Sequence, residues 1–327
     1  MFEYTKEDLN IMAKEFNFNR DTLEKVIRLI KILDFINLNP QIKDKLVLKG
    51  GTAINLSVFE LPRLSVDIDL DFMINISREQ MLLERDIITF ELKRYFDMEG
   101  YILSSKSKSR HSLDSFVINY INSAGINDNI KIEINYSLRS HLFKCVRKKI
   151  NLKQIETKTE IAILNKFELF AAKINALLSR AMPRDLYDVY NACKNNIFNE
   201  TELTFLRASF VFYTAISQEN IPEYYSLEPI DNISLKNALA ALQPVFHKGS
   251  KIELDHYKET VKTFVAKVID IDDKQREFLD LFRQKIYRPE LLFSDEAVLK
   301  NIINHPMVIW KISEDIKEMP VKNDILK

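Results

Sequence analysis

The segments LVLKGGTAINL at residues 46–56 and RLSVDIDLDF at residues 63–72 decide the fold of this chain. In the second segment, four apolar residues alternate with Asp67, Asp69 and Asp71. Because the side chains of a strand point to opposite faces with a period of two, this spacing predicts a strand with three carboxylates on one face. Like charges side by side on a sheet repel, so such a row persists where water solvates it or a cation neutralises it.

A glycine turn precedes this strand. Gly50 and Gly51 stand where the apolar run of the first segment ends, in a chain with only 5 glycines. Glycine permits a sharp turn and lets backbone N–H groups approach an anion, and Thr52 is placed to cap a following helix. A lone Gly-Gly pair usually only shapes a loop, and a lone D-x-D is more often a solvated edge strand. The functional hypothesis therefore depends on their combination.

The combination resembles the signature of the polymerase-beta-like nucleotidyltransferases, in which the turn holds a triphosphate and the carboxylates hold magnesium. Nucleotidyl transfer depends on positioning and charge neutralisation, and two metal ions about 3.5–4 Å apart clamp the attacking and leaving oxygens. Mg²⁺ (or Mn²⁺) takes carboxylate, phosphate and water oxygens, so Asp67 and Asp69 are the predicted ligands. Asp71 lies one step farther along the strand and is a weaker candidate.

A third carboxylate is expected from a neighbouring strand. The segment NIKIEINYSL at residues 129–138 alternates apolar and polar residues, which predicts a strand with Glu133 on the same face as Lys131 and Asn135. Glu133 is a candidate third metal ligand or general base for the attacking hydroxyl. A salt bridge or a solvated face is the alternative.

Two polar residues lie just before the aspartates. The Arg63 guanidinium matches phosphate geometry bidentately, so Arg63 is a candidate ligand of the triphosphate. Ser65 is a second, weaker candidate at the same end of the strand. A structural salt bridge is the alternative for Arg63.

Farther along, residues 160–194 are predicted to form two helices, the second beginning near Pro183. On the first helix, Lys166, Lys173 and Arg180 recur every seven residues and define one approximately constant face. These three cations are predicted to contact a polyphosphate.

The second of these helices begins with carboxylates. Asp185 and Asp188 fall in its first turns, where a negative charge favours the positive end of the helix dipole. For Asp185 the structural alternative is an ion pair with Arg180 or Arg184. The sequence leaves that alternative open.

The chain resembles the AbiEii family of bacterial nucleotidyltransferase toxins, and the related MenT toxins, in motifs that occur in this order: GGTAINL, RLSVDIDLDF, KIEINY, KINALLSRAMPRDLYDVY, PELLF and HPMVIWK. These motifs extend over most of the chain, although Gly-Thr stands where the wider superfamily usually has Gly-Ser. The resemblance links activity to Gly51, Asp67, Asp69, Lys173 and either Asp185 or Asp188. It also implies metal-dependent transfer of NMP from NTP to an RNA acceptor, notably a tRNA 3′ end, by a toxin that an antitoxin counters in phage defence.

The expected fold class is α+β: a polymerase-beta-like nucleotidyltransferase core, with a small mixed sheet and flanking helices, then a mostly helical C-terminal domain. Residues 1–45 are expected to form a helical segment packed on the core, and residues 46–155 the catalytic domain. Residues 156–327 are expected to form the helical domain, which contributes Lys173 and either Asp185 or Asp188 to the site. Helices are also expected over residues 5–37 and 78–98.

Composition favours a cytoplasmic enzyme with no membrane anchor. With 327 residues and 46% hydrophobic content the chain can bury a large core, and no apolar run reaches the ~18 residues of a bilayer span. Cys145 and Cys193 are too few for a disulfide framework and are expected to be reduced. The 47 basic and 47 acidic residues cancel, which argues against a generally basic nucleic-acid-binding surface. Local basic runs at residues 104–112 and 144–153 are the candidate RNA contacts.

Two other functions remain open from the sequence. One is a nucleotidyltransferase that modifies a small hydroxylated molecule such as an aminoglycoside. The other is a non-catalytic binding module whose acidic face is solvated or docks a partner.

Overall fold

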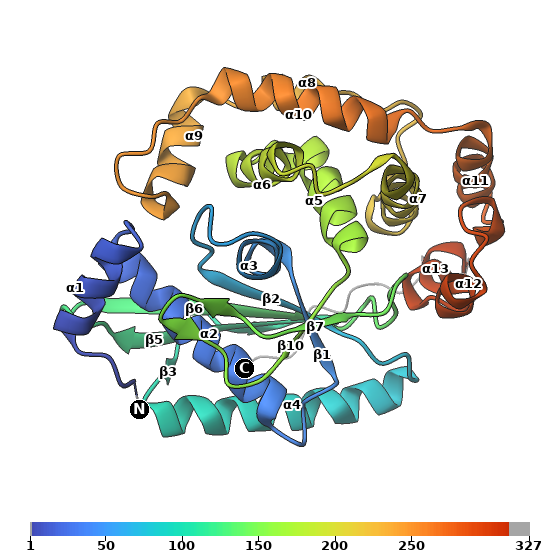
Figure 1. Cartoon of the computed structure of the whole chain (residues 1–327). Coiled ribbons are helices and arrows are strands. Elements are labelled where there is room, and N and C mark those ends of the chain that lie inside the picture. The colour runs from blue at the N-terminus through green and yellow to red at the C-terminus, as the bar shows by residue number, and fades with distance from the viewer. Residues whose placement is uncertain (1, 314–327) are drawn as a thin grey trace.

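A computed structural model describes residues 2–313 and shows one central mixed sheet with helices on both faces (Figure 1). The strand order is β3-β5-β6-β2-β1-β10-β7, and β4 pairs with β5. The strands are β1 Leu46–Lys49, β2 Asp67–Phe72, β3 Ile102–Leu103, β4 Lys108–Ser109, β5 Leu113–Ile121, β6 Asn127–Asn135, β7 Val146–Lys148, β8 Asn151–Leu152, β9 Ile155–Glu156 and β10 Ile161–Ile163. The short pair β8 and β9 forms a separate ribbon.

The carboxylate strand β2 lies inside the sheet. It runs parallel to β6 on one side and antiparallel to β1 on the other. Its apolar residues Ile68, Leu70 and Phe72 are buried, as the period of two predicts. The solvated edge strand that was the alternative reading of D-x-D is therefore wrong, because β2 has a hydrogen-bonded neighbour on each side.

Helices precede and follow the first strands. The expected helix over residues 5–37 is two helices, α1 Lys6–Glu15 and α2 Arg20–Leu38, because Asn17 adopts a positive φ of 57° and the Asn19 side chain caps α2. The helix expected over residues 78–98 is α4 Arg78–Glu99. In Figure 1, α4 lies across the face of the sheet opposite to α3 Gly50–Ala53.

The C-terminal half of the described chain is mostly helical. Its helices are α5 Lys166–Arg180, α6 Pro183–Lys194, α7 Glu200–Ser217, α8 Glu228–Asp231, α9 Leu235–Leu242, α10 Leu254–Ile269, α11 Asp273–Arg283, α12 Glu296–Ile302 and α13 Pro306–Ile312, with short 3₁₀ turns at Gln243–Val245 and Pro289–Leu291. Residues 314–327 of the expected C-terminal domain lie outside the described residues. The fold class is α+β, as predicted.

One segment differs from its predicted state. Residues 161–163 were expected at the start of a helix but form β10, which pairs in parallel with β1 and antiparallel with β7. All three are buried, so the sheet supplies both a backbone partner and an apolar environment for this short run. The helix begins later, at Lys166, where Asn165 caps it.

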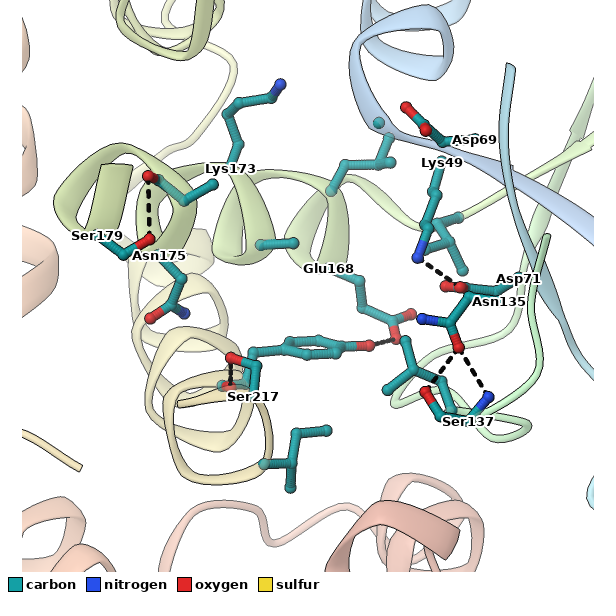
Figure 2. Close-up of a pocket in the computed structure, with 18 of the residues that line it drawn as sticks. Lys49, Asp69, Asp71, Asn135, Ser137, Glu168, Lys173, Asn175, Ser179 and Ser217 are labelled. Carbon is teal, nitrogen blue, oxygen red and sulfur yellow. Dashed lines mark hydrogen bonds and ion pairs between the residues drawn. The ribbon is translucent and has the colours of Figure 1, made fainter. Parts of the chain in front are cut away.

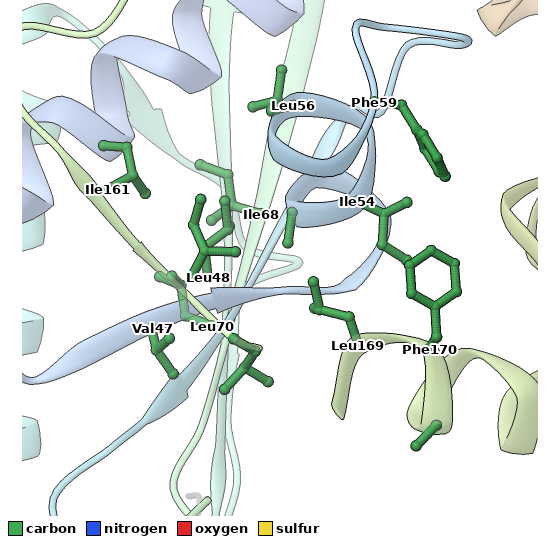
Figure 3. Packing of buried hydrophobic residues seen from close by; sticks show 14 of the residues in the cluster. Val47, Leu48, Ile54, Leu56, Phe59, Ile68, Leu70, Ile161, Leu169 and Phe170 are labelled. Carbon is green, nitrogen blue, oxygen red and sulfur yellow. The ribbon is translucent and has the colours of Figure 1, made fainter. Parts of the chain in front are cut away.

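Buried apolar side chains connect the glycine turn and α5, which both contribute residues to the candidate active site. Ile54 begins the π-helical turn Ile54–Val58 that continues α3, and Phe59 follows this turn. Both pack towards Leu169 and Phe170 of α5 (Figure 3), and the rings of Phe59 and Phe170 meet edge to face at 6.3 Å. All four are buried. Each such side chain stabilises the fold by about 1.5–3 kcal/mol. The glycine turn and α5 are thus held against one another by apolar contact.

Two further expectations concern the cysteines and the membrane. Cys145 and Cys193 are free thiols, as predicted, and burial raises the pKa of Cys193 to about 12. Within residues 2–313, none of the helices combines the length and the apolarity required to cross a bilayer.

Candidate active site

The glycine turn joins β1 to α3 directly against the carboxylate strand. Gly50 has a φ of +71°, which favours glycine, and a Cβ placed on it would lie 2.4 Å from Asp69 Oδ2. A Cβ on Gly51 would lie 2.9 Å from Arg63 Nη2 and 3.1 Å from Ser65 Oγ. Neither position accommodates a side chain without displacing a neighbour, so the two glycines allow the helix terminus to approach β2 closely.

Thr52 does not cap the helix, contrary to the prediction. Lys49 occupies the N-cap position, and Thr52 lies inside α3, fully buried. Its hydroxyl donates to the backbone carbonyl of Asp67 and shares a hydrogen bond with the Ser65 hydroxyl, with 3.0 Å between the two oxygens. Thr52 and Ser65 therefore tie the first turn of α3 to the start of the carboxylate strand.

The predicted carboxylates share one face of the sheet. Asp69 on β2 stands in register with Glu133 on β6, and Asp67 stands in register with Lys131. The Lys131 ammonium lies 2.9 Å from Glu133 Oε2. Asp67, Asp69 and Glu133 are all partly buried. Two strands whose paired residues are 64 positions apart in the sequence thus place their acidic groups beside each other.

Asp69 sits in an unfavourable environment for its own charge. Burial raises its pKa above the ordinary value of 3.8, and the charges of Asp67 and Glu133 raise it further, whereas Lys49 acts in the opposite direction. A cation placed at this carboxylate would relieve both the lost hydration and the repulsion. Asp69 is therefore suited to bind a positive ion.

A second group of charged residues lies next to the glycine turn and consists of Arg63, Lys173, Asp185 and Asp188. We call this group the buried ion cluster. Arg63 donates from Nε and Nη2 to the two oxygens of Asp188 at 2.9 and 2.7 Å. Lys173 Nζ lies 2.8 Å from Asp185 and 3.1 Å from Asp188. Each of the four residues is at most 8% exposed.

The cluster neutralises itself. Burial alone would raise the pKa of Asp188, but Arg63 and Lys173 outweigh it and hold this pKa below the ordinary value. Burial alone would lower the pKa of Lys173, but Asp188 and Asp185 outweigh it and raise this pKa. All three nitrogens of the Arg63 guanidinium also donate to protein acceptors, with Nη1 on the Leu64 carbonyl.

The seven-residue series on α5 divides between two places. Arg180 Nε donates to Asp185 at 2.9 Å, so Arg180 rather than Arg184 pairs with this carboxylate. Lys166 instead pairs with Glu202 of α7 at 2.6 Å and lines a different cleft. The prediction that all three cations meet one polyphosphate is wrong for Lys166.

A cleft of about 630 Å³ opens beside the glycine turn (Figure 2). Its polar lining includes Lys49, Asp69, Asp71, Lys173 and Arg180, and α5 and α7 supply apolar walls. This size suits a nucleotide, because small-molecule sites are typically clefts of about 300–1,000 Å³. Asp67 and Glu133 do not line it and lie beside it on the sheet.

Two residues at this cleft were not singled out from the sequence. Lys49 lines it and forms an ion pair with Asp71. Glu168 is fully buried and accepts hydrogen bonds from the backbone N–H groups of Leu142 and Phe143, at 2.9 and 3.2 Å, and from the Tyr213 hydroxyl at 2.5 Å. For Lys49 a signal existed, since it directly precedes Gly50; for Glu168 no local pattern pointed to the site.

The basic runs lie far apart on the sheet. Residues 104–112 contain β4, which pairs with β5 next to β6. Residues 144–153 contain β7, the strand at the opposite end of the sheet. The two runs therefore do not form one basic surface around Glu133.

The donor set suits a magnesium ion that is shared with a substrate. Among residues 2–313 no three Asp, Glu, His or Cys side chains converge into a ready metal cage. Mg²⁺ usually takes one or two carboxylates and completes its shell with water and phosphate oxygens. The poorly solvated Asp69 carboxylate beside a turn that only glycine fits, with Asp67 two residues away, meets that requirement.

Residues 32–282 match the family model described as nucleotidyl transferase AbiEii toxin, type IV TA system. The chain belongs to the AbiEii family. It is therefore a nucleotidyltransferase of a toxin family, which confirms the resemblance inferred from its motifs. No curated protein matches the chain significantly.

Solved structures agree with the fold of this AbiEii member. The nucleotidyltransferase toxin MenT4 from Mycobacterium tuberculosis is similar over 91% of this chain and 99% of its own, with a TM-score of 0.65 and 15% identity. An antigenic nucleotidyltransferase-like protein from Paracoccidioides brasiliensis aligns over 84% of this chain and 96% of its own, with a TM-score of 0.32 and 14% identity. The first similarity shows a shared fold, and the second is too weak to support an argument.

Proposed function

We propose that this enzyme transfers a nucleoside monophosphate from an NTP to RNA, with the 3′ end of a tRNA as the acceptor and pyrophosphate as the leaving group. One observation carries the proposal: a glycine turn lies so close to Asp69 that a Cβ on Gly50 would overlap this carboxylate, and a nucleotide-sized cleft opens at the same point. A triphosphate held by backbone N–H groups at the turn would meet the carboxylates through a shared cation.

The residues of the glycine turn and the carboxylates of β2 and β6 each have a role in this proposal. Asp67 and Asp69 would hold Mg²⁺ or Mn²⁺, which when bound neutralises the charge of the triphosphate. Gly50 and Gly51 present N–H groups to the phosphates. Glu133, in register with Asp69, orients the acceptor hydroxyl and takes its proton, or serves as a third ligand.

The buried ion cluster supports the turn from behind. Lys173 reaches the cleft and is the member that touches the triphosphate. Of Asp185 and Asp188, we assign the functional role to Asp188. Its carboxylate pairs with both Lys173 and Arg63, and its Oδ2 lies 3.8 Å from where a Cβ on Gly51 would stand. Arg63, with Thr52 and Ser65, acts on the phosphates through the position of the turn.

The biological role follows from the family. A type IV toxin family implies an antitoxin, and we propose that this chain is the toxin of such a pair in phage defence. Its action on tRNA would place it in the cytoplasm.

The test is incorporation of label from each of the four α-labelled NTPs into total RNA, with Mg²⁺ present. We expect one NTP to label RNA of tRNA size, and Asp67→Asn and Asp69→Asn to abolish the signal. A parallel reaction with ribonuclease-treated extract detects small acceptors such as aminoglycosides. Full labelling by both variants would refute the metal assignment, and labelling that survives ribonuclease treatment would refute the RNA acceptor.

A further inference from the structure

The cleft needs a cation that is free to meet phosphate, and most candidates are already committed. Arg63 is 2% exposed and has every guanidinium nitrogen on a protein acceptor. Lys173 reaches the cleft, but two carboxylates already share its ammonium, so it offers the triphosphate only part of its donor capacity. Within the described residues that line the cleft, this leaves Lys49 and Arg180 as the more accessible cations, with side chains 27% and 60% exposed.

Lys49 extends into the cleft and is held there by Asp71 (Figure 2). Its ammonium lies 2.5 Å from Asp71 Oδ1. Asp71 is fully buried, and apart from this ion pair neither carboxylate oxygen has a hydrogen-bond partner among residues 2–313. A buried carboxylate with so little support costs free energy unless a cation stays beside it. Asp71 thus restrains the Lys49 ammonium at one place in the cleft.

The backbone puts Lys49 beside the metal-binding carboxylate as well. Lys49 ends β1 opposite Asp69 in the antiparallel register, and Gly50 follows it directly. Asp67, Asp69 and Asp71 carry three negative charges and Lys49 one positive charge, so the group has a net charge of −2. One divalent cation balances that charge, and the polyphosphate then needs donors of its own.

We propose that Lys49 is a further substrate-binding residue, whose ammonium, anchored on Asp71, donates to phosphate oxygens of the nucleotide held at the glycine turn. This inference rests on the proposed function and deepens it. An ammonium has three N–H donors, and Asp71 engages it from one side only. The partly exposed side faces the cleft, so donors remain for an anion. Asp71 is a positioning residue that does not touch the substrate.

The competing explanation is that Lys49 only balances the charge of Asp71. The two explanations differ in a double variant. Lys49→Met leaves Asp71 buried and unpaired, whereas Lys49→Met with Asp71→Asn removes both charges together. A purely structural pair would recover full nucleotide binding in the double variant, but a substrate-binding lysine would not.

The experiment is calorimetric titration of the full chain with Mn²⁺ alone, and with Mn²⁺ plus the α,β-methylene analogue of each of the four NTPs. We expect Lys49→Met to weaken analogue binding about 10- to 100-fold, since a hydrogen bond to a charged group is lost. Mn²⁺ alone should bind equally well or more tightly, because a positive charge beside Asp69 is gone. Lys49→Arg should lose at most a few-fold.

The double variant should bind the analogue as weakly as Lys49→Met, while its thermal unfolding midpoint returns towards that of the wild type. Wild-type analogue affinity in either variant would overturn the role of Lys49. Absence of analogue binding by the wild-type chain would overturn the proposed function together with this inference. Analogue binding without RNA labelling would overturn the RNA acceptor alone.

Discussion

Two acidic regions of this molecule use the same residue types in opposite ways. In the buried ion cluster each carboxylate has cations within 3.1 Å, and positive and negative charges balance. In the carboxylate row of β2, Asp71 pairs with Lys49, whereas Asp67 and Asp69 form no ion pair with any residue between 2 and 313. The charges of the first region balance one another within the protein, whereas the second region has unbalanced negative charge beside a cleft. Excess charge next to open space distinguishes a ligand site from a structural clamp.

The largest expected effect is a loss of nucleotidyl transfer when the carboxylate row of β2 is changed. Asp69→Asn removes a proposed metal ligand and should lower nucleotidyl transfer by roughly 10³-fold or more, since a metal ion supplies several kcal/mol of charge stabilisation. It should not lower the unfolding midpoint, because the buried charge that it removes is itself unfavourable. Labelled-NTP incorporation and differential scanning calorimetry measure the two quantities. A variant that loses activity together with its fold would contradict the contrast.

The buried ion cluster should respond in the opposite sense. Asp188→Asn leaves Arg63 and Lys173 buried without their shared carboxylate, and we expect a loss of about 3–5 kcal/mol in the free energy of unfolding. Urea denaturation measures it, with Asp67→Asn as the matched control in a partly buried position. If Asp188→Asn is as stable as that control, the cluster is not the structural clamp described here.

A third, smaller effect concerns the glycine turn. Gly50→Ala should cost about 1 kcal/mol or more in stability from its positive φ, and in addition should displace Asp69 and weaken Mn²⁺ binding. Gly249→Ala is the matched control, because Gly249 has a φ of +79° and nothing within 4 Å of a Cβ. Both variants should lose stability in urea, and Gly50→Ala should lose at least as much as Gly249→Ala. Equal Mn²⁺ affinities in the two would show that the close approach to Asp69 is irrelevant.

The sequence predicted those features that depend on local periodicity. Alternation along β2 and β6 placed Asp69 and Glu133 on one face, and the register confirms that they are neighbours. The glycine turn was recognisable because only glycine permits its geometry. These inferences need only the neighbouring residues in the chain.

Features that depend on distant partners were not predictable in this way. Arg63 pairs with a carboxylate 125 residues away, so its sequence context left phosphate binding and a salt bridge equally open. Residues 161–163 became a strand because β1 and β7 offered pairing on both sides. Lys166 pairs with Glu202, although it belongs to the same seven-residue series as Lys173. In each case tertiary contacts decided among states that local pattern allows.

The smallest expected effect is a difference in pH dependence between the two regions. The pKa of Asp69 is raised in the folded chain, so its charge destabilises the fold at neutral pH and that penalty fades as pH falls towards the raised pKa. The pKa of Asp188 is lowered, so its contribution to stability is present above the ordinary value of 3.8 and disappears only as pH falls through the lower folded value.

Mn²⁺ titrations across the acidic range test this difference at the proposed metal site. Because the metal must displace a proton from Asp69, its affinity should begin to fall at a pH above 3.8 and then drop by up to about tenfold per pH unit. Lys49→Met should move that onset to higher pH, since Lys49 is the cation that opposes the rise. An onset at the ordinary aspartate value in both proteins would mean that Asp69 is well solvated. The excess negative charge on β2 would then not be what draws a cation to the row.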